Sequence, residues 1–276
     1  MADAGGAAGR VAADDQAQAG RLFELPKPRG RAIRKPDKSG YVTPGFGVLP
    51  GVTTILGATS EGKHRLEQWL KRPDAAAIGE AARNRGTWLH TQTEEWLTAH
   101  SGGASSLPTA TGVSYEEKTH SASSFAFGGY WRNMKPWLEK HWDQLVALEQ
   151  PIYHPSRFAG SFDALGYIAY GDEPEALTLC DWKTSQRTRT EDLVEDYKCQ
   201  LAAYSMGLEY VYGVSPERAL LVIARPHGPA PDIWELNASE LEAAKSRFKA
   251  RLQRYYAVAE GDDTGPEGAD NTDIAA

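Results

Sequence analysis

The stretch Leu177-Thr178-Leu179-Cys180-Asp181-Trp182-Lys183-Thr184-Ser185 determines how the rest of the chain is interpreted. Its two leucines alternate with other residues at a period of two, which predicts a β-strand. The same alternation places Asp181 and Lys183 on one face of the strand and turns Trp182 to the other. A carboxylate and an ammonium at the end of a buried strand suit a divalent metal ion and a phosphate. The alternative is an ion pair on an exposed strand end, and this short motif alone favours that alternative.

Composition limits the class of protein. The chain has 276 residues, of which 41% are hydrophobic and 24% charged, enough for one large domain or two small ones. No apolar run approaches the ~20 residues of a membrane helix, and the N-terminus lacks the apolar core of a secretory signal. Cys180 and Cys199 are the only cysteines. They are too few for a four-thiolate zinc site or an iron–sulfur cluster, and a cytoplasmic location is expected.

Charge is unevenly distributed around a net value of −7. Residues 1–38 hold eight Lys/Arg and five Asp/Glu, whereas residues 259–276 hold six Asp/Glu and no Lys/Arg. Both segments lack apolar periodicity, which predicts a flexible N-terminal tail and an acidic, disordered C-terminal tail. Residues 39–258 are predicted to form one domain. Its modest acidic charge does not exclude a basic groove, because phosphate contacts depend on local charge.

The periodicity between the tails predicts a mixed sheet flanked by helices. Helices are predicted over 63–71, from Asp74 to about His100, from Phe125 to about Leu148, over 191–212, and after a cap at Ser239. Strands are predicted at 149–154, 158–168 and 177–185 as a meander, at 218–225, and at 232–236 as an edge. The apolar strand at 218–225 is expected to run parallel to its neighbour, because a helical crossover precedes it.

A metal site is predicted at the end of the meander. Asp163 and Asp181 are the carboxylate ligands that Mg²⁺ prefers, with the backbone carbonyl of Trp182 as a third. Lys183 would position an attacking water and counter the charge that develops in the transition state. His90 could complete the coordination through a ring nitrogen, which suits Mn²⁺ better than Mg²⁺.

Further polar residues are predicted near this site. Gln200 and Tyr204 lie four apart on the helix that follows the strand, and Glu149 and Glu94 are auxiliary carboxylates. Each candidate has an ordinary structural alternative. Asp163 could be a hairpin residue, Tyr204 a core aromatic, Gln200 a solvated residue and His90 a polar helix residue under a loop. Their order along helix, strand, strand and helix is much harder to meet by accident.

This order resembles the PD-(D/E)XK nuclease superfamily, in its RecB-like exonuclease branch. The matching pieces are Gly86-Thr-x-x-His90, Gly160-x-x-Asp163, Cys180-Asp181-Trp-Lys-Thr-Ser185 and Gln200-Leu-Ala-Ala-Tyr204. Upstream, Leu49-Pro-Gly-Val-Thr-Thr-Ile-Leu56 followed by Leu66-x-x-Trp69 is similar to phage-encoded exonucleases and the mitochondrial genome-maintenance exonuclease. The resemblance covers roughly residues 40–255. Phe162 and Gly51 stand where the family motifs have proline and often serine, and the four cysteines of the iron–sulfur members are absent.

The resemblance implies a restriction-endonuclease-like core, a mixed sheet flanked by helices with extra N-terminal helices. It also implies a Mg²⁺- or Mn²⁺-dependent site that acts on DNA ends, often single-stranded. By position, the family's metal ligands fall on His90, Asp163 and Asp181, its catalytic lysine on Lys183, and its auxiliary pair on Gln200 and Tyr204.

The function expected from these observations is a metal-dependent DNA exonuclease for single-stranded or frayed ends, in phage-type recombination or DNA turnover. Arg187, Arg189 and Arg225 are candidate DNA contacts. A recombination or single-strand-binding protein is a candidate partner, and no membrane is involved. Two alternatives stay open: a structure-specific or nicking endonuclease, and a non-catalytic DNA-binding accessory protein of recombination.

Overall fold

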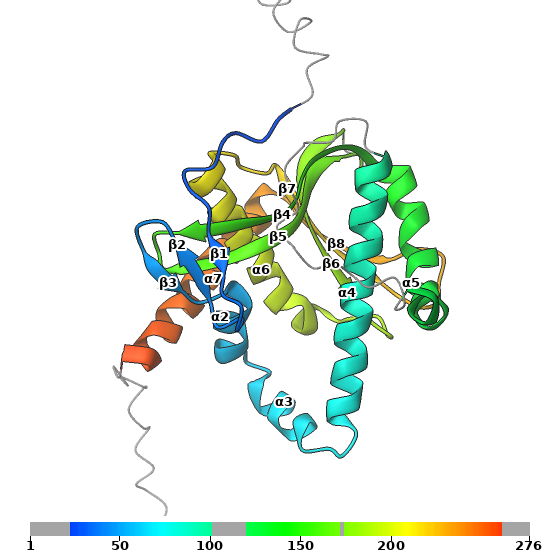
Figure 1. Cartoon of the computed structure of the whole chain (residues 1–276), viewed down its shortest axis with the longest axis horizontal. Helices are drawn as coiled ribbons and strands as arrows, with labels where there is room; N and C mark the ends of the chain where they lie inside the picture. Colours follow the sequence, from blue (N-terminus) through cyan, green and yellow to red (C-terminus); the bar gives the residue numbers. More distant parts are fainter. Residues whose placement is uncertain (1–22, 101–119, 172–173, 261–276) are drawn as a thin grey trace, which may run out of the picture.

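The computed structural model describes residues 23–100, 120–171 and 174–260, which form a mixed α/β fold (Figure 1). The elements in chain order are β1 (Ile33–Arg34), β2 (Tyr41–Thr43), β3 (Gly47–Leu49), α2 (Val52–Thr59), α3 (Lys63–Leu70), α4 (Ala75–His100), α5 (His120–His141), β4 (Trp142–His154), β5 (Phe158–Ile168), β6 (Ala176–Thr184), α6 (Glu191–Tyr212), β7 (Arg218–Ala224), β8 (Asp232–Leu236) and α7 (Ala238–Glu260). The mixed sheet flanked by helices is therefore confirmed.

The main sheet has the strand order β4-β5-β6-β7-β8. Strands β4, β5 and β6 form the predicted antiparallel meander, and β8 pairs antiparallel with β7 at the far edge. Strands β6 and β7 are parallel, with Asp181 opposite Leu221. This parallel pair requires α6 as a crossover, so the helix that follows β6 is held against the sheet beside it.

Helices cover both faces of the sheet (Figure 1). Leu177 and Leu179 of β6 are buried in one apolar cluster with residues of α2, α6 and α7. Cys180 and Trp182 are buried in a second cluster with residues of α4 and α5. The predicted period of two is thus the reason that Asp181 and Lys183 lie on the α6 face while Trp182 packs beneath α4 and α5.

A small antiparallel sheet, in the order β1-β2-β3, precedes α2. It adjoins the main sheet through a bridge between Gly51 and Ala159. The ring of Phe23 packs edge-on against Tyr167, at a centroid distance of 6.2 Å. The folded part therefore begins before residue 39, and the predicted tail of residues 1–38 is corrected for residues 23–38. The rest of that tail, and residues 261–276 of the C-terminal one, lie outside the described residues.

Two predicted boundaries are wrong. Helix α5 ends at His141 and β4 begins at Trp142, whereas the sequence pattern extended the helix to Leu148. Trp142 and Leu145 have helical spacing, but the register shifts between β4 and β5 let an irregular strand bury both. The last helix begins after Asn237, not Ser239, because Asn237 Oδ1 accepts a hydrogen bond from the Glu240 N–H and Glu240 Oε2 accepts one from the Asn237 N–H.

None of the helices in the described parts of the chain combines the length and the apolar character needed to cross a bilayer.

Candidate metal centre

Two buried carboxylates lie side by side on β5 and β6. Ala164 pairs with Cys180 in the antiparallel register, so Asp163 and Asp181 occupy the next opposed positions. Asp181 is fully buried and Asp163 is 7% exposed. Asp163 Oδ2 accepts a hydrogen bond of 2.7 Å from the Trp182 N–H. The two predicted carboxylate ligands are therefore brought together.

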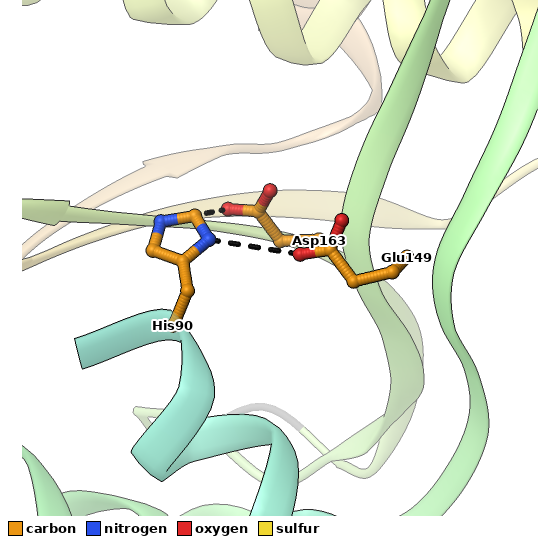
Figure 2. A group of neighbouring side chains, drawn as sticks. All are labelled: His90, Glu149 and Asp163. Atoms are coloured by element: carbon orange, nitrogen blue, oxygen red, sulfur yellow. Dashed lines mark ion pairs between the residues drawn. The ribbon is translucent and has the colours of Figure 1, made fainter. Parts of the chain in front are cut away.

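His90 reaches this pair from α4, which is anchored by the buried Trp88 and Leu89. Its Nε2–H donates to the Trp182 carbonyl at 2.9 Å, and the same nitrogen lies 3.7 Å from Asp163 Oδ2. Its Nδ1 lies 3.6 Å from Glu149 Oε1. Figure 2 shows the imidazole facing both carboxylates, with a dashed line to each. One ligand atom from each of His90, Glu149 and Asp163 lies within 4.8 Å of the others, so an ion could bind among them.

Glu149 enters the cluster from an unusual backbone conformation. Its neighbours Leu148 and Gln150 pair with Ala164 and Phe162, which places Glu149 opposite Asp163. Its φ is +48°, in the left-handed region that residues other than glycine rarely adopt. Such a conformation costs on the order of 1 kcal/mol or more and persists only where the surroundings impose it. Glu94, the other auxiliary carboxylate, is not in the cluster, although burial raises its pKa and so does the charge of Glu149.

Lys183, Gln200 and Tyr204 surround Asp181. The Lys183 ammonium forms an ion pair with Asp181 Oδ2 and lies 5.3 Å from the ring centroid of Tyr197. Gln200 Nε2 donates to Asp181 Oδ1 and to Tyr204 Oη, at 2.9 Å each. The residues predicted on β6 and α6 thus form one connected group. Tyr197 was not predicted as part of it, although it precedes Gln200 by three residues and therefore shares its helix face.

The protonation of the centre reflects burial among opposite charges. Burial raises the pKa of Asp181 to about 6, although Lys183 opposes the rise. Burial also raises the pKa of Asp163, against the opposing charges of His90 and Lys183. Burial lowers the pKa of His90, but Asp163 and Glu149 outweigh it and raise the pKa to about 9. Burial likewise lowers the pKa of Lys183, and Asp181 outweighs it, so the net shift is upward. The charges of Asp163 and Asp181 are therefore balanced by protonated His90 and by Lys183. A metal ion could replace the charge of His90, because a histidine must lose its proton to bind a metal.

The donor set fits a hard divalent cation. Asp163, Asp181 and the Trp182 carbonyl supply oxygen atoms, and His90 can supply a nitrogen, a combination suited to Mg²⁺ or Mn²⁺. Asp181 Oδ2 faces the Lys183 ammonium as its ion-pair partner, so a metal ion at this oxygen would share it with that ammonium or displace it. Cys180 lies buried in the core beneath α4 and α5, and Cys199 is buried in the apolar cluster that α6 shares with α2 and α7.

The three candidate DNA-binding arginines differ in their surroundings. Arg187 is exposed. Arg189 Nε donates to Ser185 Oγ, and Arg225 forms a 3.0 Å ion pair with Asp232. Arg225 Nη1 also donates to Thr188 Oγ1, so this guanidinium uses both terminal nitrogens within the protein and has fewer donors to offer a phosphate.

Arg85 is a basic residue at the site that the sequence analysis did not single out. It lies on α4 just over one turn before His90, and its Nε donates to Thr184 Oγ1 at 3.0 Å. Its Cζ lies 5.1 Å from the ring centroid of Tyr130, which fixes the guanidinium beside the residue that follows Lys183. The signal available in the sequence was its position immediately before Gly86, inside the segment that ends at His90.

Comparisons with known proteins do not identify the chain. No family model matches it, and no curated protein matches its sequence. Among solved structures it is similar to the one titled "Crystal structure of SSO0001", with 15% sequence identity over 74% of this chain and 75% of that one. The TM-score of 0.32 is too low to support an argument about fold or function.

Proposed function

We propose that the protein is a metal-dependent DNA exonuclease that hydrolyses phosphodiester bonds at single-stranded or frayed ends. The observation that carries this proposal is the convergence of His90, Asp163, Asp181, Lys183 and the Trp182 carbonyl on one strand end. A Mg²⁺ or Mn²⁺ ion bound there would activate a water molecule and neutralise charge on the scissile phosphate. The resemblance of the sequence motifs to RecB-like nucleases supports DNA as the substrate.

The protein's own groups have separable roles in this proposal. His90, Glu149 and Asp163 have ligand atoms close enough to share one ion, and Asp181 on the neighbouring strand would join them when the ion binds. Gln200 fixes the Asp181 carboxylate by its hydrogen bond to Oδ1, and Tyr204 fixes Gln200 in turn. These two are positioning residues.

Lys183 is the group best placed to act on the substrate. Its ammonium faces Asp181 Oδ2 while 21% of its side chain stays exposed, so it can contact both the centre and an entering phosphate. It would position the attacking water and stabilise the charge that develops on the phosphoryl oxygens. The Arg85 guanidinium, held by Thr184, would bind a neighbouring phosphate of the strand.

A non-catalytic DNA-binding role is less consistent with these groups. An unused centre would still bury the Asp163 and Asp181 carboxylates, and the desolvation cost of a buried charge is only partly offset even where a cation pairs with it. A role in phage-type recombination or DNA turnover, with a single-strand-binding or recombination partner, is part of the proposal and rests on the motif resemblance.

The decisive experiment is digestion of end-labelled linear and closed circular single strands, with Mg²⁺, with Mn²⁺ and with EDTA. Metal-dependent loss of the linear strand from its ends, with the circle intact, is the expected result. Asp181→Asn should abolish it, whereas Asp74→Asn, which changes an exposed carboxylate paired with Arg72, should not. Cleavage of the circle would instead identify a nicking endonuclease, and full activity of Asp181→Asn would refute the proposed site.

A further inference from the structure

A cavity of about 380 Å³ adjoins the candidate metal centre on the side of the small sheet. Its lining includes Arg31, Arg34, Tyr41, Glu149, Pro151 and Ser161. Glu149 belongs to both places, because its Oε1 lies 3.6 Å from His90 Nδ1. A molecule in this cavity would therefore lie one side chain away from the metal centre.

The cavity wall carries two cations that no carboxylate neutralises. Arg31 and Arg34 are exposed, and within the described residues neither forms an ion pair with an acidic side chain. The Cζ of Arg34 lies 6.0 Å from the ring centroid of Tyr41, so the ring helps to hold that guanidinium at the rim. Glu149 is the acidic residue in the lining, and its charge is directed toward His90.

These features suit a nucleotide that carries a phosphate monoester. Guanidinium groups bind phosphate oxygens through paired, charge-assisted hydrogen bonds. Tyr41 and Pro151 supply apolar surface for a sugar or base, and Ser161 supplies a hydroxyl. A volume of about 380 Å³ lies near the lower end of the range for small-ligand sites, which fits one nucleotide better than a strand.

We propose that this cavity binds a single phosphorylated nucleotide next to the metal centre, with its phosphate held by Arg31 and Arg34. The inference rests on the proposed nuclease function and extends it to recognition of the substrate. The bound group is either the phosphorylated terminal nucleotide of the strand or the mononucleotide that cleavage releases. Both have the same chemistry, and they differ in whether the rest of the strand is attached.

The test is a binding measurement that does not depend on catalysis. Thymidine monophosphate, thymidine and inorganic phosphate are titrated into the Asp181→Asn protein with Mg²⁺, by isothermal titration calorimetry. Thymidine monophosphate should bind and the other two should bind at least about tenfold more weakly, because each lacks half of the contacts. Arg31→Ala and Arg34→Ala, added singly, should each weaken the nucleotide by about tenfold or more.

Controls separate a loss of contacts from a loss of fold. Lys140→Ala removes an exposed positive charge two residues before β4, and the seven residue steps along the strand from Trp142 to Glu149 put it roughly 20 Å away. Its binding should be unchanged. Arg31→Lys and Arg34→Lys should bind with intermediate affinity, because a lysine keeps the charge without the paired donors. Two results would overturn the inference: no binding of thymidine monophosphate to the Asp181→Asn protein, or equal binding by that protein with and without Arg31→Ala or Arg34→Ala at unaltered melting temperatures.

A second arm identifies the source of the nucleotide. Oligonucleotides with a 5′-phosphate, a 3′-phosphate or neither are compared for binding in the same variants. A phosphate effect that disappears in Arg31→Ala assigns the cavity to the strand terminus, and an effect confined to free mononucleotide assigns it to the product. Failure of the wild-type protein to digest DNA would refute the proposed function without changing these binding results, so the two proposals can fail separately.

Discussion

Tyr204 packs directly against Gly160, where a larger residue would not fit. We therefore expect the single methyl group of Gly160→Ala to displace Tyr204 and, through it, the candidate metal centre. A Cβ at Gly160 would lie 2.8 Å from Tyr204 Cε1 and 3.4 Å from Val52 Cγ2. Carbon atoms pack best at about 3.5–4.0 Å, so the ring must retreat by roughly 1 Å. Because Tyr204 Oη accepts a hydrogen bond from Gln200, which also donates to Asp181, this movement reaches a carboxylate of the candidate metal centre.

The expected effects of Gly160→Ala can be stated in magnitude. Overpacking of this kind costs about 1–3 kcal/mol of unfolding free energy. A displacement of about 1 Å in a positioning group can lower a catalytic rate by roughly 10²-fold. The first quantity is measured by urea unfolding and the second by the rate of digestion of an end-labelled single strand at saturating substrate. Gly57→Ala in α2 is the matched control, since nothing lies within 4 Å of its Cβ, and it should keep full activity.

Two measurements test whether the Tyr204 ring causes these effects. If the Tyr204 ring is the obstacle, Gly160→Ala should lose most of its destabilising effect in a Tyr204→Ala background, as contacting residues do in a double-mutant cycle. An equal loss of stability with and without the ring would show that the contact is not the cause. Normal digestion rates in the single variant would show that the position of Tyr204 does not matter.

Three further predictions concern the charged groups. The pKa of Asp181 is raised from its ordinary value of 3.8 to about 6 in the folded metal-free protein, which therefore binds this proton more tightly than the unfolded chain does. Ionisation of Asp181 thus lowers the free energy of unfolding as pH rises from about 4 to 7. Asp181→Asn should therefore gain up to about 3 kcal/mol relative to wild type over that interval, measured by urea unfolding in EDTA, and a difference independent of pH would contradict this. Lys183→Met leaves the Asp181 carboxylate buried without its cation and should lose about 3–5 kcal/mol of stability, most of it recovered in the Asp181→Asn/Lys183→Met double variant. Glu149→Gly relieves a φ of +48° and should raise the melting temperature while it weakens Mn²⁺ binding in equilibrium dialysis; unchanged Mn²⁺ affinity would exclude Glu149 as a ligand.

The local pattern of β6 was sufficient to predict which side of the sheet each residue faces. Leu179 and Asp181 lie toward α6 and Trp182 lies toward α4 and α5, as the period of two requires. The placement of Asp163 and Asp181 on neighbouring strands followed from the predicted meander, whereas the register that sets them opposite each other is given by the structure. The assignment of these residues to DNA hydrolysis stays a prediction.

Other features could not be predicted because they depend on tertiary partners. The left-handed conformation of Glu149 is imposed by its surroundings, and no local sequence preference favours it. Arg225 at the end of β7 forms an ion pair with Asp232 of β8. The sequence shows Arg225 as a basic residue but does not show that a carboxylate of the next strand already neutralises it. Trp142 and Leu145 are spaced as on one face of a helix, so the sequence pattern predicted a helix where β4 begins. Their burial in the same cluster depends on the irregular pairing of β4 with β5, which the local sequence does not specify.

The crossover from β6 to β7 has a consequence for synthesis on the ribosome. Asp181 and Lys183 emerge before α6, whose Gln200 fixes one of them, and before β7, whose pairing shields the edge of β6. A nascent chain that stops short of residue 224 would expose that edge and could not assemble the centre. The nuclease activity proposed above would thus stay silent until translation has passed the part of the message that encodes β7.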